Sequence, residues 1–218
     1  MKILDVPRSG SYQGITSSRN RNGQYVRTRA MPVNRRTPQQ IAVRTHQTTN
    51  AAAWRSLTAA QRAGWEALGA GMQRSDRLGQ SYTLTGIQAH NSINNVLALA
   101  GSTLLPEAPA MQTPAGMATC TPTISHTVFS VAWTATPAPT GVKVIIRASP
   151  QRSAGRNFEA DFRVITVTAA AAASPTDLFA LYSARFGTPV SGNKIFISIS
   201  CTISGFESVS LVVAAIVT

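Results

Sequence analysis

The chain has 218 residues and a formal net charge of +12, because 20 Lys and Arg outnumber 8 Asp and Glu. This length suits one large or two small domains with a hydrophobic core. Two cysteines exclude a disulfide framework, and the apolar runs are shorter than the roughly 20 residues that span a bilayer. The first residues are too few and too polar for a secretory signal, so we expect synthesis in a cytoplasm.

Positive charge is concentrated in the first third of the chain. No acidic residue occurs between Val6 and Trp65, where arginines are spread among Gly, Ser, Thr, Asn and Gln. A segment of this kind attracts polyanions or acidic protein surfaces. The planar guanidinium also suits two-point contacts with carboxylates and phosphates.

We expect residues 1–36 to form an extended basic arm with turns. Its scattered apolar residues cannot offset an ordering cost of about 1–2 kcal/mol per residue. Asn22-Gly23, placed between Ile15 and Tyr25, predicts a hairpin. The arm should therefore acquire its shape against other molecules, and its expected interface residues are Arg8, Tyr12, Arg19, Arg21, Tyr25, Arg27, Arg29, Arg35 and Arg36.

Residues 37–101 predict a small helical module. Three helix starts share a Thr followed three residues later by Gln, the capping-box pattern: Thr37 with Gln40, Thr58 with Gln61, and Thr85 with Gln88. They predict a helix from Pro38 to about Leu57, a short helix that ends near Gly69 and Gly71, and a third that ends before Gly101. The residues expected to pack the module are Trp54, Leu57, Trp65 and Leu68.

Residues 102–117 are rich in Pro and predict a linker. From residue 118 to 218 the hydrophobic period becomes two-fold, which predicts strands over 128–133, 142–147, 162–168, 194–203 and 209–217, with a helical turn from Ser174 to Tyr182. About seven short strands are typical of an immunoglobulin or fibronectin type III sandwich. We therefore expect an α+β fold: an extended arm, a helical module and an all-β immunoglobulin- or fibronectin III-like sandwich.

The residues that could carry chemistry do not form a catalytic or metal set. His46, His90 and His126 lie far apart, which favours surface or packed histidines over metal ligands. Glu159 and Asp161 would share one face of a strand, but Arg156 and Arg163 flank them and predict an ion-pair patch. We expect no enzyme, no cofactor and no small-molecule substrate.

Cys120, Trp133 and Cys201 occur in the order that an immunoglobulin domain uses for its disulfide and core tryptophan. Ile199 stands two residues before Cys201, where such a domain carries Tyr. A protein assembled in a cytoplasm also rarely oxidises its cysteines. Two buried thiols are therefore preferred, and a disulfide is the alternative.

Several motifs of the first half resemble the N-terminal region of a family of phage and prophage virion structural proteins. They are NGQYVR at 22–27, PVNRRTPQQ at 32–40, the Trp, Leu-Thr, Gln-Arg, Trp pattern of 54–65, and LTG at 84–86. In that family a basic, turn-rich arm precedes a helical pair and a second helix opened by Thr-Gly. The second half is similar in general pattern to the immunoglobulin-like modules that tailed phages append to capsid, tail and decoration proteins.

The resemblance implies a non-catalytic subunit of a bacteriophage virion, assembled in the host cytoplasm. We expect a capsid-associated cement or decoration protein, or a minor capsid protein, anchored by the arm. The helical module would pack at the shell through Trp54, Leu57, Trp65 and Leu68, and the sandwich would project outward. Its expected partners are major capsid or tail subunits and copies of itself, without a membrane.

Two other functions stay open at this point. One is a tail or head–tail connector component with an immunoglobulin-like domain that binds a host receptor or glycan. The other is a nucleic-acid-binding protein, in which the arginines neutralise phosphates and Tyr12 and Tyr25 stack on bases. The arginines are dispersed and no known docking motif accompanies them, so protein docking is preferred.

Overall fold

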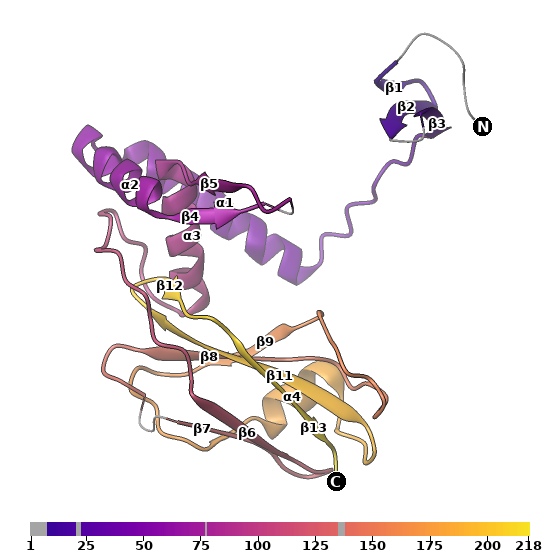
Figure 1. The fold of residues 1–218 in the computed structure, drawn as a ribbon, viewed down its shortest axis with the longest axis vertical. Helices are drawn as coiled ribbons and strands as arrows, with labels where there is room; N and C mark the ends of the chain where they lie inside the picture. Colours follow the sequence, from indigo (N-terminus) through magenta and orange to yellow (C-terminus); the bar gives the residue numbers. More distant parts are fainter. Residues whose placement is uncertain (1–7, 21–22, 77, 135–137) are drawn as a thin grey trace. The chain divides into compact units, whose positions relative to one another are not determined.

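The computed structural model describes residues 8–20, 23–76, 78–134 and 138–218, and these contain four helices and several antiparallel sheets (Figure 1). The fold is therefore mixed and consistent with the expected α+β class. The chain forms two compact units, Met1–Ala42 and Val43–Thr218. Their boundary falls inside helix α1 (Pro38–Ser56), a few residues beyond the expected end of the arm.

The first unit contains a small antiparallel sheet, which we call the arm sheet. Its strands are β1 (Gly10–Tyr12), β2 (Ile15–Asn20) and β3 (Gly23–Thr28), in the order β1-β2-β3. Pairing of β2 with β3 from Ile15–Thr28 to Asn20–Gly23 confirms the expected hairpin, although Asn22 itself lies outside the described residues. The sequence patterns do not predict β1. No described residue of the sheet is buried, so the sheet has no hydrophobic core.

The helical module contains three longer helices close to their expected bounds: α1, α2 (Ala59–Gly71) and α3 (Gly86–Leu99). Thr58 caps α2, because its N–H donates to Gln61 Oε1 (2.9 Å) and its hydroxyl accepts from the Gln61 N–H (3.3 Å). The Thr85 N–H makes the matching bond to Gln88 (2.9 Å). After α3, Gly101 has a φ of +64°, a conformation that glycine adopts without strain.

A short hairpin between α2 and α3 is not predicted by the sequence. Its strands are β4 (Gln73–Ser75) and β5 (Ser81–Thr83), which pair antiparallel. Asp76 orders the turn, since its Oδ1 accepts from the N–H groups of Leu78 (2.8 Å) and Gln80 (2.9 Å). The sequence pattern does not predict this hairpin because its strands are very short and exposed and lack alternating apolar residues.

The module has its own hydrophobic core, formed by Leu57, Trp65, Leu68, Met72, Ala89, Ile93, Leu97 and Phe206. Phe206 lies far along the chain from the helices, in a strand of the C-terminal β-domain (residues 118–218), and its side chain packs in this core. The expected linker is also tied to the module, because Trp65 Nε1 donates to the Pro106 carbonyl (3.0 Å) and the Leu105 N–H donates to Asn94 (2.8 Å). Helical module and linker therefore fold together.

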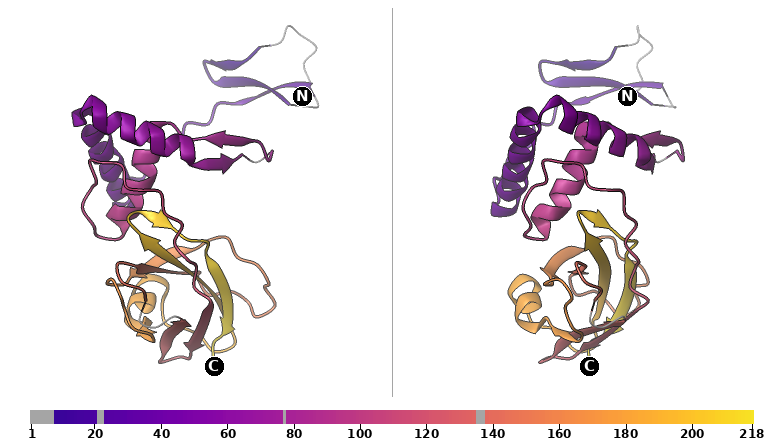
Figure 2. Two further views of the ribbon diagram at one scale, coloured as in Figure 1. Left: turned by 60° about the vertical axis from the view of Figure 1, so that its left-hand side comes forward. Right: turned by 90° about the vertical axis from the view of Figure 1, so that its left-hand side faces the viewer.

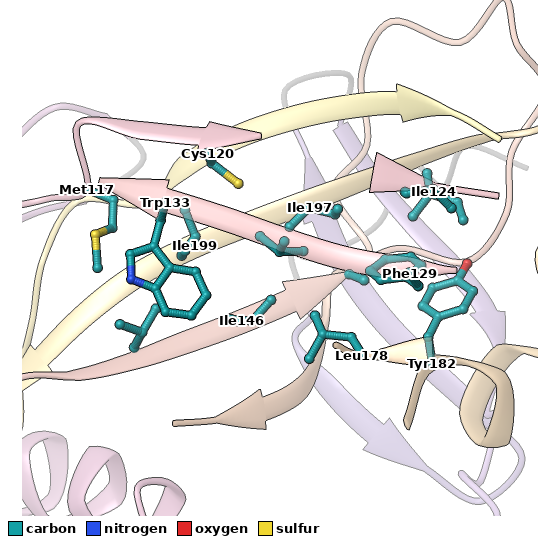
Figure 3. Packing of buried hydrophobic residues seen from close by; sticks show 14 of the residues in the cluster. Met117, Cys120, Ile124, Phe129, Trp133, Ile146, Leu178, Tyr182, Ile197 and Ile199 are labelled. Carbon is teal, nitrogen blue, oxygen red and sulfur yellow. The ribbon is translucent and has the colours of Figure 1, made fainter. Parts of the chain in front are cut away.

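The β-domain consists of antiparallel sheets that enclose a second core (Figures 2 and 3). One sheet has the order β10-β7-β6, with β6 (Thr119–Ile124), β7 (Phe129–Thr134) and β10 (Thr176–Asp177). The other has the order β12-β11-β8-β9, and β13 also pairs with β11. Its strands are β8 (Lys143–Ala148), β9 (Arg163–Val167), β11 (Lys194–Ile203), β12 (Phe206–Glu207) and β13 (Leu211–Ile216).

The five expected strands of this region are all present, and the two-fold period identifies the core face. On β7, Phe129, Val131 and Trp133 are buried, as their spacing predicts. The helix expected from Ser174 begins later, as α4 (Phe179–Phe186), because Thr176 and Asp177 pair with β7 as the strand β10. Its Tyr182 enters the core, where the ring stacks on Phe129 (centroids 4.6 Å apart) and the hydroxyl donates to the Ser149 carbonyl (3.1 Å) (Figure 3).

Candidate assembly interface

The arm sheet presents two faces of different chemistry. Opposed residues of an antiparallel pair share a face, and neighbours along a strand alternate. The register therefore places Tyr12, Ile15 and Val26 on one face and Tyr25 and Arg27 on the other. Tyr12 and Ile15 remain 73% and 48% exposed. The first face thus offers an apolar patch that the described residues of its own unit leave uncovered.

The expected arginines are spread along the arm instead of forming one dense cluster. They are distributed as follows: Arg8 before β1, Arg19 on the Tyr12 face, Arg27 on the opposite face, Arg29 directly after β3, and Arg35 and Arg36 in the exposed segment before α1. Arg21 lies outside the described residues. Since the sequence from Val6 to Trp65 contains no carboxylate, this positive charge is not balanced within the segment.

The expected packing residues of the helical module lie inside it. Leu57, Trp65 and Leu68 are buried in its core, and Trp54 is half-buried against that core. The expectation that these four side chains contact a shell needs correction, because most of their surface is already covered by the module. They hold its helices together, and a contact with another protein would use other residues.

His90, one of the three separate histidines of the sequence, is buried in the helical module. It lies between the rings of Trp54 and Trp65, whose centroids are 5.5 and 5.0 Å from its own. Neither ring nitrogen has a hydrogen-bond partner among the described residues. Burial lowers the pKa of His90. The side chain is therefore a packed neutral histidine, one of the two roles expected for it.

The two carboxylates that could imitate a catalytic pair are held in ion pairs. Asp161 pairs with Arg163 (3.0 Å), and Glu159 pairs with Arg156 (3.5 Å) and, more closely, with Arg152. The backbone N–H of Asp161, the Arg152 side chain and the backbone N–H of Ala160 lower the pKa of Glu159 to about 2. The expected ion pairs are confirmed, but the patch is not fully solvated, because Glu159 is buried. Its closest partner, Arg152, is not predicted by the sequence.

Both cysteines are free and buried, so the preferred expectation of two thiols is confirmed. Burial raises the pKa of Cys120 to about 11 and also raises that of Cys201. Such thiols are poor nucleophiles.

Within the described residues, no group of three or more side chains is arranged to hold a metal ion. None of the helices in this part of the chain has the length and apolar character needed to cross a bilayer.

Two of the cavities that the described residues form lie in the second unit. One, of about 510 Å³, is lined mainly by apolar groups, among them Met117, Val142 and Ile203. The other, of about 420 Å³, lies among β4, α3 and the segment around β12, and Arg74 is one of the residues that line it. The sequence carries no signal for this second cavity, because its walls come from three segments that are far apart along the chain.

Comparison with known proteins adds no assignment to this geometry. No protein-family model matches the sequence, and the curated proteins give no match to it.

Proposed function

We propose that this protein is a non-catalytic structural subunit of a bacteriophage virion. It acts as a capsid-associated cement or decoration protein, or as a minor capsid protein, and it is anchored through the arm sheet and the basic segment that follows. The observation that carries this proposal is the arm sheet itself. It exposes Tyr12 and Ile15 beside arginines and buries no side chain of its own.

A sheet without a core needs an external surface to become stable. Small antiparallel sheets are marginal in water unless a hydrophobic face is covered, and covering apolar area supplies about 25 cal/mol per Å². The partner surface should combine an apolar patch for Tyr12 and Ile15 with carboxylates for the arginines. Neighbouring capsid subunits and further copies of this chain are the partners that we propose.

We also propose that the β-domain is a variant of the immunoglobulin or fibronectin III sandwich. Two features support this: antiparallel sheets face each other across one core, and Cys120 on β6 and Cys201 on β11 lie on opposite sheets. Helix α4, which contacts β7 and β9, would be an addition to that plan. Trp133 is buried in the core, so it does not supply an exposed ring for glycan stacking.

The test is incorporation of an arm variant into particles. Residues 2–36 are deleted, and the protein is followed in virions purified from the producing cells. We expect the truncated chain to remain folded and soluble but to be lost from particles. Undiminished incorporation would overturn the proposal. Separation of heads from tails then decides between the capsid position and the alternative position in a tail or connector.

Charge variants identify what the arm recognises. Replacing Arg19, Arg27 and Arg29 by Gln should reduce incorporation, whereas replacing the same three by Lys should preserve part of it, because charge is kept and two-point hydrogen bonding is lost. Nuclease treatment of opened particles separates the remaining alternative. If the protein is released together with degraded nucleic acid, the arm binds nucleic acid and the proposed protein docking is wrong.

A further inference from the structure

The cavity beside β4, which we call the Arg74 cavity, is lined by both polar and apolar residues. Three of the residues that line it are Arg74 on β4, which is exposed, Ser92 on α3, and Ser210 in the segment after β12. Ile93 and Phe206, two buried members of the module core, also line it. The lining residues thus include one arginine and two serines beside the apolar residues Ile93 and Phe206.

Three polar side chains that line this cavity have no partner within the described chain. The side chains of Arg74, Ser92 and Ser210 make no hydrogen bond or ion pair with any described residue. Glu207 also lines the cavity, but its carboxylate is balanced by Arg147 (2.7 Å) and accepts from the Ser200 hydroxyl (2.7 Å). The cavity therefore has one uncompensated positive charge.

The charge balance selects the kind of anion. A guanidinium binds a carboxylate through two parallel hydrogen bonds, and serine hydroxyls can donate to the remaining lone pairs. A dianionic phosphate would bring excess negative charge close to Glu207. A carboxylate carries a single negative charge. The methylene groups of an acidic side chain could also pack against the apolar lining residues Ile93 and Phe206.

We propose that the Arg74 cavity binds the carboxylate side chain of an acidic segment from a neighbouring protein of the assembly. This inference rests on the proposed function, because it takes the partner to be another virion protein. It gives the second unit a docking point of its own, separate from the arm.

The proposal is tested on the full-length protein in solution by NMR. The probe is the peptide acetyl-Gly-Ser-Glu-Ser-Gly-amide, with its Gln analogue as a control, in buffer with about 150 mM salt to screen exposed charges. The Glu peptide should shift the backbone amides of Arg74, Ser92 and Ser210 in a saturable way, with a Kd on the order of 1 mM. The Gln peptide and inorganic phosphate should bind there at least several-fold more weakly.

Variants then assign the binding to this cavity. Arg74→Gln should weaken the Glu peptide about tenfold, as expected for loss of a charge-assisted hydrogen bond. The matched control Arg55→Gln, an exposed arginine on α1, should leave binding unchanged. Equal binding of both peptides, tighter binding of phosphate, no shift at these amides, or no effect of Arg74→Gln would each overturn the inference.

A failure of the peptide to bind at the Arg74 cavity can be distinguished from a failure of the proposed anchoring by the arm. The peptide measurement needs no particle and reads amides of the second unit only. Loss of the arm is expected to abolish incorporation even if the peptide does not bind. If the peptide binds at the Arg74 cavity and arm deletion leaves incorporation unchanged, the cavity inference stands and the arm proposal fails.

Discussion

At the scale of single residues, the least satisfied group of the described chain is His90. A buried polar group without a hydrogen bond costs roughly 1–3 kcal/mol, and both nitrogens of this ring lack a partner among the described residues. The edges of Trp54 and Trp65 against the ring compensate in part, because aromatic pairs contribute about 0.5–1.5 kcal/mol. This environment therefore favours the neutral form of the ring.

This environment predicts an acid sensitivity of the helical module. The pKa of His90 is lower in the folded chain than its ordinary value of 6.5, because burial disfavours the charged ring. The unfolded chain therefore binds the proton more readily, and stability that is present above pH 6.5 is lost as the pH falls. The loss can reach about 1.4 kcal/mol per pH unit. Unfolding monitored by tryptophan fluorescence between pH 8 and 5 measures it.

The control for this prediction is His90→Leu. This substitution removes the two ring nitrogens that lack hydrogen-bond partners, and it also removes the group that takes up the proton. At pH 8 we expect its free energy of unfolding to lie within about 1 kcal/mol of the wild type, since the lost ring contacts offset the gain. Between pH 6.5 and 5 it should lose less stability than the wild type. Equal losses in both proteins would show that other groups cause the acid response.

At the scale of elements, the turn between β11 and β12 joins the β-domain to the helical module. Ser204 and Gly205 have φ values of +50° and +83°, as in the two-residue turns that favour glycine. Gly205 also lies against α3: a Cβ added there would be 2.5 Å from Ile93 Cγ2 and 2.8 Å from the Ile93 carbonyl oxygen. The turn therefore packs directly on the helix backbone.

We predict that Gly205→Ala destabilises the protein by about 2–4 kcal/mol, the sum of a positive φ and an overpacked contact. The matched control is Gly192→Ala, because Gly192 has a φ of +85° and open space around its Cβ position. That variant should lose only about 1–2 kcal/mol. Chemical denaturation of both variants measures the difference, and equal losses would mean that the packing on α3 contributes nothing.

The sequence predicts elements well where their signal is local. The Thr and Gln of each capping box lie three residues apart, so the starts of α1, α2 and α3 can be read directly from the sequence. The alternation of Phe129, Val131 and Trp133 likewise identifies the buried face of β7. Both signals depend only on neighbours within one or two turns of the chain.

The sequence does not reveal features that arise from distant contacts. Phe206 completes the core of the helical module, but its two-residue strand carries no pattern that points to helices. Arg152 is the close partner of Glu159, whereas charge spacing alone favours Arg156. The Arg74 cavity is hidden for the same reason, because three separate segments form its walls.

At the scale of the whole molecule, the two compact units differ in how they are stabilised. The second unit contains both hydrophobic cores, one in the helical module and one in the β-domain. These cores are joined by direct contacts: Phe206 enters the helical core, and Lys143 Nζ donates to the Ala100 carbonyl (2.6 Å) at the end of α3. The arm sheet has no buried residue.

This contrast predicts that the arm contributes almost nothing to the stability of the free protein. A chain that begins at Thr37 keeps the cap of α1, in which the Thr37 N–H donates to Gln40 (3.3 Å), and keeps both cores intact. Its Tm should lie within about 2 °C of the full-length value, because no buried apolar area is removed. Calorimetry on the two purified proteins provides the measurement. A markedly lower Tm would show that the arm is folded against its own chain, and the arm would then no longer be free to dock on a neighbouring subunit.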